Sequence, residues 1–262
     1  MKNYGLKLDK QEPQDYVFGA VLPTEILQQD GDWSDHLPVK EFQNLNGVEP
    51  YACVSYTLLN CVEILIKRKY GVEKNYSERF LAAISGTKEG GNSPKTVAEF
   101  LRKIGVVPQE IWPFDTSIDT FEKFYSPVPA KIYQIAEEFR KEFDFKYEFV
   151  PSNHTSITRA LKSSPLLISV SAWFENDKGQ FYRPDGMTDN HATTLFVEKE
   201  GEYMRVFDSY DRPVIKDIVW TAIPQQVMSF KIAKKSVDKP LLGNFWQGII
   251  DFIKEWFSKR IE

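Results

Sequence analysis

Residue types that build covalent and metal cross-links are scarce in this chain. Among its 262 residues are two cysteines, Cys53 and Cys61, and three histidines. The cysteines lie eight positions apart on one predicted helix, about 12 Å along its axis, so a disulfide between them is excluded while that helix is intact. We therefore expect no disulfide scaffold, no metal site and no cofactor, and a reducing compartment is compatible with this composition.

Long apolar runs and dense basic runs are also missing. No stretch is long and apolar enough to predict a transmembrane helix, and the N-terminal sequence lacks the apolar core of a signal peptide. The net charge is -4, and lysines and arginines are dispersed along the chain. A nucleic-acid partner is therefore not expected, while a cytoplasmic location fits these features.

The periodicity of the chain changes from helical to extended near Pro165. Apolar spacings of three and four predict helices over 52–69, 76–84, 94–104 and 155–162. Runs rich in β-branched and aromatic residues predict strands over 166–171, 190–198, 202–208, 214–221 and 227–232. Helices that dominate one half and antiparallel strands that dominate the other indicate an α+β fold with two lobes and a cleft between them.

The same pattern divides the chain into four parts. Residues 1–37 are polar and broken by Pro and Gly, and predict an extended arm packed on the body. The body is 38–232, with a helical lobe over about 38–150 and a β lobe over about 151–232. In the tail 233–262, residues 241–260 predict an amphipathic helix that either docks on the body or a partner, or lies on a membrane surface; its weakly basic polar face favours docking.

Cys53 stands at the first turn of the predicted helix 52–69, which leaves two interpretations open. The free N–H groups and the dipole at a helix N-terminus favour an anion, and would lower the pKa of the thiol and make it a nucleophile. A free cysteine is also common as a small buried residue in a core helix. The sequence of this stretch alone does not decide between a reactive and a structural cysteine.

A nucleophilic thiol needs a base, and the base needs a group that orients it. Of the three histidines, His191 begins one predicted strand, and the next strand ends at Asp208. A hairpin of this length can place the two side by side. Asp208 could then accept a hydrogen bond from one imidazole nitrogen and leave the other to face the thiol of Cys53.

Segments spread over about residues 4–232 resemble, in the same order, the motifs of the papain-like cysteine peptidases. They are Pro38-Val39-Lys40 with Gln43, like the PVKNQ approach; Ala52-Cys53-Val54-Ser55-Tyr56, in place of SCWAF; Gly90-Gly91-Asn92 with Trp112-Pro113-Phe114, like the Gly-Gly shelf and a YPY-like segment; Asn190-His191-Ala192, like the NHA motif; and Phe207-Asp208-Ser209-Tyr210, where the family has NSW. The stretch from Tyr4 to Gly19 also resembles a leader of bacterial and viral members, which adds a virion-associated protein to the locations that fit.

This resemblance implies a papain-like two-lobed fold, with the cysteine helix in the helical lobe and the histidine and aspartate in the antiparallel β lobe. It implies a cysteine endopeptidase that cleaves a peptide or protein substrate through a thioester. The roles it implies are nucleophile, base and orienting group for Cys53, His191 and Asp208, an oxyanion-hole amide for Gln43, and substrate contacts for Gly90, Gly91, Asn190 and Tyr210.

Several positions depart from the family pattern. The stretch between Gln43 and Cys53 is longer than usual, so Asn44 and Asn46 are rival amide donors. Val54 and Asp208 stand where the family has Trp and Asn, and Tyr210 replaces a second Trp. Two alternatives therefore stay open beside the peptidase. One is an inactive papain-like module used for binding or assembly, and the other is an amidase or acyl transferase that uses the same triad.

Overall fold

The computed structural model describes residues 4–20 and 24–235. Its helices are η1 (Ser34–His36), η2 (Leu45–Gly47), α1 (Cys53–Tyr70), α2 (Glu78–Ile84), α3 (Pro94–Ile104), η3 (Gln109–Ile111), α4 (Phe121–Phe124), α5 (Ala130–Glu142) and α6 (His154–Leu161). Its strands are β1 (Phe143–Phe149), β2 (Leu166–Val170), β3 (Phe174–Glu175), β4 (Phe181–Tyr182), β5 (His191–Lys199), β6 (Tyr203–Phe207), β7 (Ile215–Val219) and β8 (Val227–Lys234). The tail predicted as a helix over 241–260 lies outside these residues.

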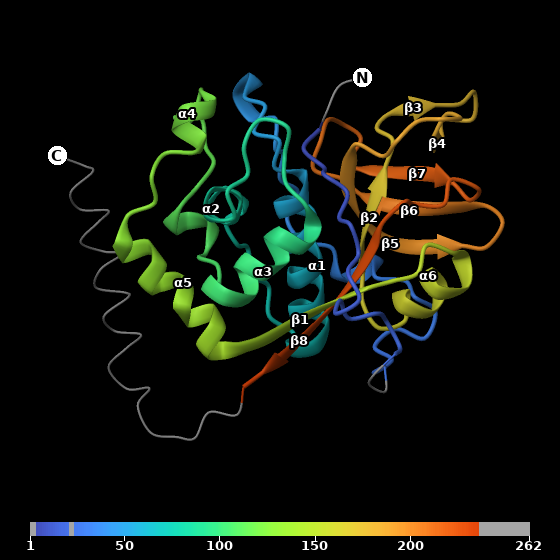
Figure 1. Cartoon of the computed structure of the whole chain (residues 1–262), viewed down its shortest axis with the longest axis horizontal. Coiled ribbons are helices and arrows are strands. Elements are labelled where there is room, and N and C mark those ends of the chain that lie inside the picture. Colours follow the sequence, from blue (N-terminus) through green and yellow to red (C-terminus); the bar gives the residue numbers. More distant parts are fainter. Residues whose placement is uncertain (1–3, 21–23, 236–262) are drawn as a thin grey trace.

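The eight strands form one sheet in the order β1-β8-β2-β5-β6-β7-β4-β3. Every neighbouring pair is antiparallel except β4 and β7, which are parallel. Helices α2 to α5 lie on one side of the molecule, most of the sheet lies on the other, and α1 stands between them (Figure 1). The predicted α+β class is confirmed.

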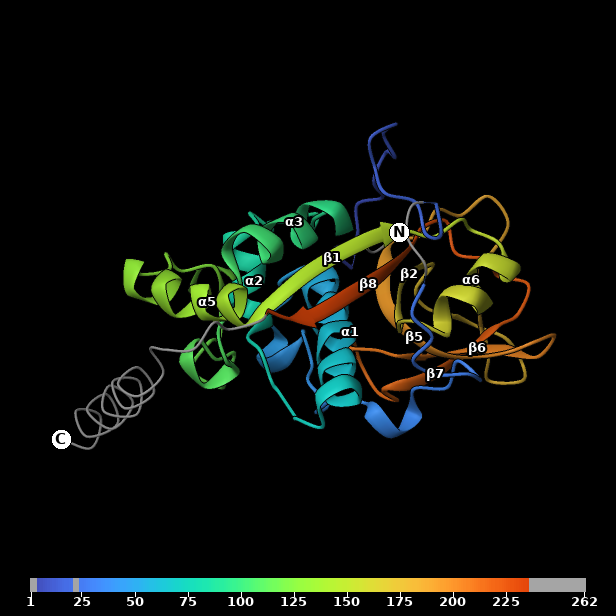
Figure 2. The ribbon, with the colours of Figure 1, turned by 90° about the horizontal axis from the view of Figure 1, so that it is seen from below.

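Two strands join the helical side to the sheet. Strands β1 and β8 make a long antiparallel ribbon that runs from the helices toward the rest of the sheet (Figure 2). Strand β1 lies inside 38–150, the range predicted for the helical lobe, and its burial alternates because Phe143 and Phe145 face inward between the exposed Asp144 and Lys146. The ribbon thus ties the two sides of the molecule together.

Local sequence explains where the helices begin and end. The hydroxyls of Ser77 and Ser93 and the amide of Asn153 accept hydrogen bonds from the first turns of α2, α3 and α6, as N-cap residues do. Gly71 ends α1 in the left-handed region at φ 65°, which glycine adopts without steric cost. These caps fix the starts of α2, α3 and α6 and the end of α1.

Helix α1 is buried over most of its length. Its first fourteen residues, Cys53–Ile66, are all buried. It contacts α2 and α3 on the helical side and β2, β5 and β8 on the sheet side. The side-chain hydroxyl of Thr194 on β5 donates to the carbonyl of Thr57 at 3.3 Å, which fixes β5 beside the first turns of α1. No helix of the described ranges combines the length and apolar character of a membrane span.

Buried carboxylates lie between α1 and α2. Glu63 accepts a hydrogen bond from the backbone N–H of Tyr76 at 2.7 Å, and Glu78 is hydrogen-bonded to Glu41. Burial raises the pKa of Glu63 and of Glu78 well above the ordinary value, and the charge of Glu41 raises both further. The folded protein therefore holds protons at these carboxyls that the unfolded chain releases above about pH 4.5.

This linkage predicts how stability changes with pH. Because the folded-state pKa values are raised, the stabilisation is complete below the unfolded pKa and is lost as the pH rises toward the folded pKa. We expect the free energy of unfolding to fall as the pH rises above about 5, by up to about 1.4 kcal/mol per pH unit for each retained proton. Glu78→Gln should flatten this decline, and Glu122→Gln, at an exposed position, should not. Urea unfolding across this pH range measures both, and parallel curves for wild type and Glu78→Gln would contradict the account.

Candidate active site

Cys53 is the first residue of α1, and its side chain is fully buried. The backbone N–H groups of Ala192 and Val54 point at the thiol. They favour the thiolate, yet burial outweighs them and raises the pKa of Cys53, with the charges of Asp208 and Glu49 adding to the rise. The expectation of a lowered thiol pKa is therefore wrong for the structure as described, because desolvation exceeds the effect of the helix N-terminus.

His191 and Asp208 lie at the site from neighbouring strands. Strands β5 and β6 form the predicted hairpin, with Thr194 opposite Phe207. His191 begins β5 and Asp208 directly follows β6, near this pair of residues. His191 Nε2 and Asp208 Oδ1 are 2.6 Å apart, and both side chains are fully buried. The other ring nitrogen, Nδ1, has no hydrogen-bond partner among the described residues. Ala192, the residue after His191, is the one whose backbone N–H points at the thiol of Cys53.

Asp208 has partners at both oxygens. Oδ2 accepts from Lys216 Nζ at 2.7 Å and from the backbone N–H of Tyr210 at 3.2 Å. Burial alone would raise the pKa of Asp208, but the positive charges of His191 and Lys216 hold it below its ordinary value. The Tyr210 hydroxyl donates to Glu49 at 2.6 Å. The Tyr210 ring meets the His191 ring edge to face with centroids 6.1 Å apart, at the position where the family pattern has a Trp.

Gln43 is fully buried, and its backbone N–H donates to the carbonyl of Ser209 at 2.9 Å. Within the described part of the chain, neither atom of its side-chain amide has a hydrogen-bond partner. The amides of the rival donors are engaged elsewhere: Asn44 donates to Asp211 at 2.7 Å, and Asn46 to the Asp115 carbonyl at 3.0 Å. An unpaired buried amide is costly, and a ligand oxygen at this position would relieve that cost.

The other predicted substrate contacts lie along the N-terminal arm. The N–H of Asn92 donates to the carbonyl of Gly5, and the N–H of Lys7 donates to the carbonyl of Asn92, both at 3.0 Å. A Cβ on Gly91 would overlap the backbone of Gly5. Gly91, which follows Gly90 at the end of the loop, therefore lets another backbone approach closely. In the described structure that backbone is the arm.

The arm continues over His191. The N–H of Tyr4 donates to the carbonyl of Asn190 at 3.2 Å. Its ring meets the rings of His191 and Tyr210 edge to face, with centroids 5.5 and 4.7 Å apart. Figure 1 shows the arm running between the helical side and the sheet. The arm thus passes over His191 along the Gly90-Gly91 loop.

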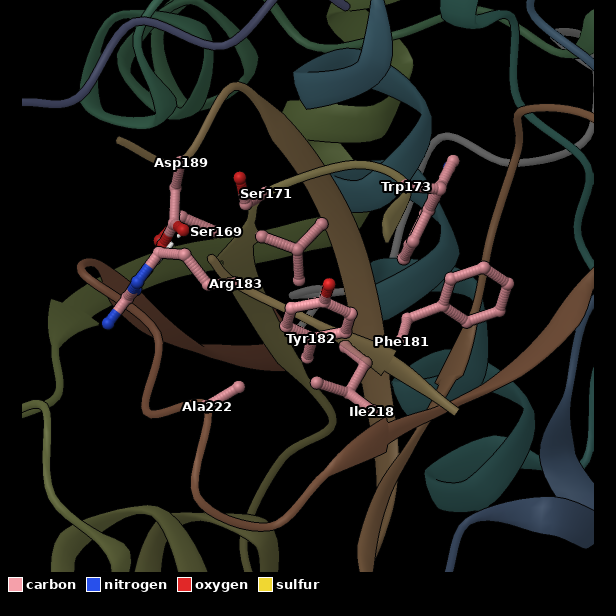
Figure 3. A pocket seen from close by; sticks show the side chains of 10 residues that line it. Ser169, Ser171, Trp173, Phe181, Tyr182, Arg183, Asp189, Ile218 and Ala222 are labelled. Atoms are coloured by element: carbon pink, nitrogen blue, oxygen red, sulfur yellow. Dashed lines mark hydrogen bonds and ion pairs between the residues drawn. The ribbon is translucent and has the colours of Figure 1, made fainter. Parts of the chain in front are cut away.

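A small pocket adjoins the site on the side of the sheet. Figure 3 shows Trp173 and Phe181 on one side of this pocket and Asp189, Ser169 and Arg183 on the other. Asp189 accepts hydrogen bonds from Ser169 at 2.6 Å and Arg183 at 3.1 Å. Asp189 is therefore paired, while Ser171 Oγ and Trp173 Nε1 in the same lining have no hydrogen-bond partner among the described residues. Across the described residues, no group of three or more His, Cys, Asp or Glu side chains is placed to hold a metal ion.

Comparison with solved structures identifies the fold. Bromelain from Ananas comosus, solved with the E64 inhibitor, aligns with a TM-score of 0.57 at 20% identity over 76% of this chain and 97% of its own. Xylellain, a cysteine protease from Xylella fastidiosa, aligns at 0.61 and 17% over 90% and 96%. The Carica candamarcensis cysteine protease CMS1MS2 aligns at 0.59 and 17% over 80% and 99%.

These likenesses show that the chain has the fold of the papain-like cysteine proteases, and the predicted resemblance is confirmed at the level of the fold. No model of a known protein family matches the sequence. A search of curated proteins also finds no match.

Three residues of the site are not singled out by the sequence patterns. Lys216 and Trp173 enclose Asp208 and His191, and Tyr4 covers them from the arm. Lysine in a strand normally predicts a solvent-facing position, so nothing in the sequence marks Lys216. Tyr4 carries a weak signal, because it belongs to the leader-like stretch.

Contact between the arm and His191 predicts how accessible the thiol of Cys53 is. Tyr4→Ala removes the ring that packs against His191 and Tyr210. We expect Cys53 to be alkylated by iodoacetamide about tenfold faster or more, which corresponds to about 1.4 kcal/mol of lost arm docking. Tyr16→Ala, at a 65% exposed position of the same arm, is the matched control and should leave the rate unchanged. Peptide-level mass spectrometry separates Cys53 from Cys61. Equal rates in the two variants would show that the arm does not cover the thiol.

Proposed function

We propose that this protein is a cysteine endopeptidase in which Cys53, His191 and Asp208 form the catalytic triad. The observation that supports this most strongly is the 2.6 Å contact between His191 Nε2 and Asp208 Oδ1. It leaves Nδ1 of the same ring without a partner among the described residues. The thiol of Cys53 lies beside the backbone of Ala192. These contacts support the assignment of Cys53 as nucleophile, His191 as base and Asp208 as orienting group, which are the roles that this chemistry requires.

The first half of the reaction is acylation. His191 takes the proton of the Cys53 thiol, and the thiolate sulfur attacks the carbonyl carbon of the scissile amide. A C–S bond forms, and the carbonyl oxygen becomes an oxyanion. The C–N bond then breaks as His191 gives its proton to the leaving amine, which departs and leaves a thioester on Cys53.

The second half is hydrolysis of the thioester. His191 takes a proton from water, whose oxygen attacks the thioester carbonyl carbon. The C–S bond breaks, the acid product leaves, and His191 returns the proton to the sulfur. Asp208 accepts a hydrogen bond from Nε2 throughout, so Nδ1 faces the reacting atoms at every step.

The oxyanion of both halves needs hydrogen-bond donors in place before it forms. The backbone N–H of Cys53, at the start of α1, is one donor. The side-chain amide of Gln43 is the other, because it is buried and has no partner in the part of the chain that the structure describes. The hydrogen bond from the backbone N–H of Gln43 to the carbonyl of Ser209 holds Gln43 close to Asp208, which precedes Ser209.

An extended substrate would lie along the Gly90-Gly91 loop. The arm already pairs its backbone with Asn92 there, so this surface accepts an extended chain at close range. Asn190 offers a backbone carbonyl, which accepts from Tyr4 in the described structure. The arm must leave this surface before a substrate can enter.

A pair of substitutions tests the nucleophile. Cys53→Ala should abolish hydrolysis of a peptide library, because no other group can form the thioester. Cys61→Ala should retain hydrolysis, since Cys61 lies eight residues further along α1 and is buried in the core. Cleavage is followed by mass spectrometry of the library, and inhibition by E64 is measured in parallel. Undiminished cleavage by Cys53→Ala would refute the catalytic role.

A second set of variants tests the oxyanion hole. Gln43→Ala should lower kcat by about a hundredfold with little change in KM, because the amide acts on charge that develops only in the transition state. Asn44→Ala and Asn46→Ala are matched controls, since their amides are committed to Asp211 and Asp115. Steady-state kinetics on one cleaved peptide gives both constants. A larger loss in either control than in Gln43→Ala would reassign the donor.

A further inference from the structure

We propose that Lys216 is a positioning residue of this site, which compensates the buried charge of Asp208 while His191 gives and takes its proton. The inference rests on the proposed function, because it concerns how His191 cycles between two protonation states. It gives a role to a residue that lies outside the Cys-His-Asp triad. The residue acts on the reaction only through Asp208.

The contacts of Lys216 are directed at the third residue of the triad. Its ammonium donates to Asp208 Oδ2 at 2.7 Å and to the carbonyl of Tyr210 at 2.9 Å. Oδ1 of the same carboxylate is hydrogen-bonded to His191 Nε2 at 2.6 Å. The carboxylate of Asp208 thus bridges the ammonium of Lys216 and the imidazole of His191, with one oxygen for each.

The placement of Lys216 runs against the hydrophobic pattern of its strand. On β7, Ile215 is 42% exposed while Lys216 is 4% exposed. Lysine is almost never fully buried unless it is paired, because its charge must leave water. The strand register, with Val206 opposite Lys216 and Phe207 opposite Ile215, sets the lysine beside the end of β6, where Asp208 follows.

Trp173 closes the site around this pair. The Lys216 ammonium lies 4.8 Å from the centroid of the Trp173 ring, and the same ring meets His191 edge to face at 5.4 Å. Figure 3 shows Trp173 standing at the edge of the adjoining pocket. A cation over an aromatic face is stabilised by the ring quadrupole, so the lysine is held without access to bulk water.

The charge balance explains why a lysine belongs here. The titratable groups that face the pair are His191 from β5, Cys53 from α1 and Tyr4 from the arm. Glu49 and Asp211 are charged neighbours of Tyr4 and Tyr210. When His191 is protonated, Asp208 has two cationic partners. When His191 has given its proton away, Lys216 is the partner that remains, and without it Asp208 would be a buried anion with no compensating charge.

An uncompensated carboxylate would hold the imidazolium too tightly. Opposite charge close to a group favours its charged form, so His191 would release its proton to the leaving amine less readily. A neutral amide at position 208 would orient His191 without this effect. We therefore expect the protein to keep its activity when Asp208→Asn and Lys216→Met are made together. Each substitution made alone should lower the activity.

The test is a double-mutant cycle of Lys216→Met, Asp208→Asn and the combined variant, in the full chain. We expect Lys216→Met to lower kcat on a cleaved peptide about tenfold or more and to move the alkaline limb of the pH profile upward by about one unit or more. The combined variant should return within about tenfold of wild type in kcat, with the alkaline limb restored. Lys199→Met, an exposed lysine on β5 paired with Glu202, is the matched control and should match wild type.

A substrate-independent measurement separates this inference from the proposed function. With histidine labelled by ¹⁵N, the chain gives signals from three imidazole rings with two nitrogens each, and the pH at which the His191 ring loses its proton can be followed directly. We expect this pH to rise in Lys216→Met and to return in the combined variant. If wild type cleaves no peptide but the His191 titration follows this pattern, the proposed function fails and the role of Lys216 stands.

Other results would overturn the role of Lys216. If Lys216→Met matches wild type in kcat and titration, the lysine has no influence on His191. If the loss in Lys216→Met is not relieved by Asp208→Asn, the lysine only supports the loop after β6. Should Lys216→Met fail to fold, the combined variant decides: a folded but inactive combined variant contradicts the proposal, and an active one supports it.

Discussion

The structure depends on the contact between the N-terminal turns of α1 and strand β5. Residues 53–66 of α1 are buried on every side, and the hydroxyl of Thr194 on β5 bonds the carbonyl of Thr57 on α1. The same contact places the thiol of Cys53 against the N–H of Ala192. Because the helix comes from the first half of the chain and the strand from the second, the candidate site exists only where the two sides meet.

Burial gives this site its electrostatic character. Cys53, His191 and Asp208 are all fully buried, so every charge among them needs a partner. Asp208 has two, His191 and Lys216, and the thiol has backbone N–H groups that are too weak to offset desolvation. Burial therefore favours the neutral thiol in the described arrangement, in which Tyr4 of the arm packs against His191. Displacement of Tyr4 would let water or a substrate reach it.

Sequence reasoning is most successful where local chemistry decides the outcome. The caps at Ser77 and Ser93 and the hairpin that joins His191 to Asp208 follow from patterns within a few residues. Strand β1 is missed although Phe143 and Phe145 alternate with charged residues, because its partner β8 lies far along the chain. Lys216 cannot be predicted at all: the charge that requires its burial comes from Asp208, and only the folded register of β6 and β7 brings them together. The roles of the site residues stay predictions.

The central claim is that Cys53 forms a covalent acyl-enzyme with a peptide. Rapid mixing of the protein with a cleaved peptide, followed by acid quench and mass spectrometry, would trap that species. The account predicts a thioester that adds the mass of the acyl half of the peptide to the fragment containing Cys53, and that decays at the rate at which the acid product appears. Cleavage of the peptide with no adduct, or with the adduct on another residue, would contradict it.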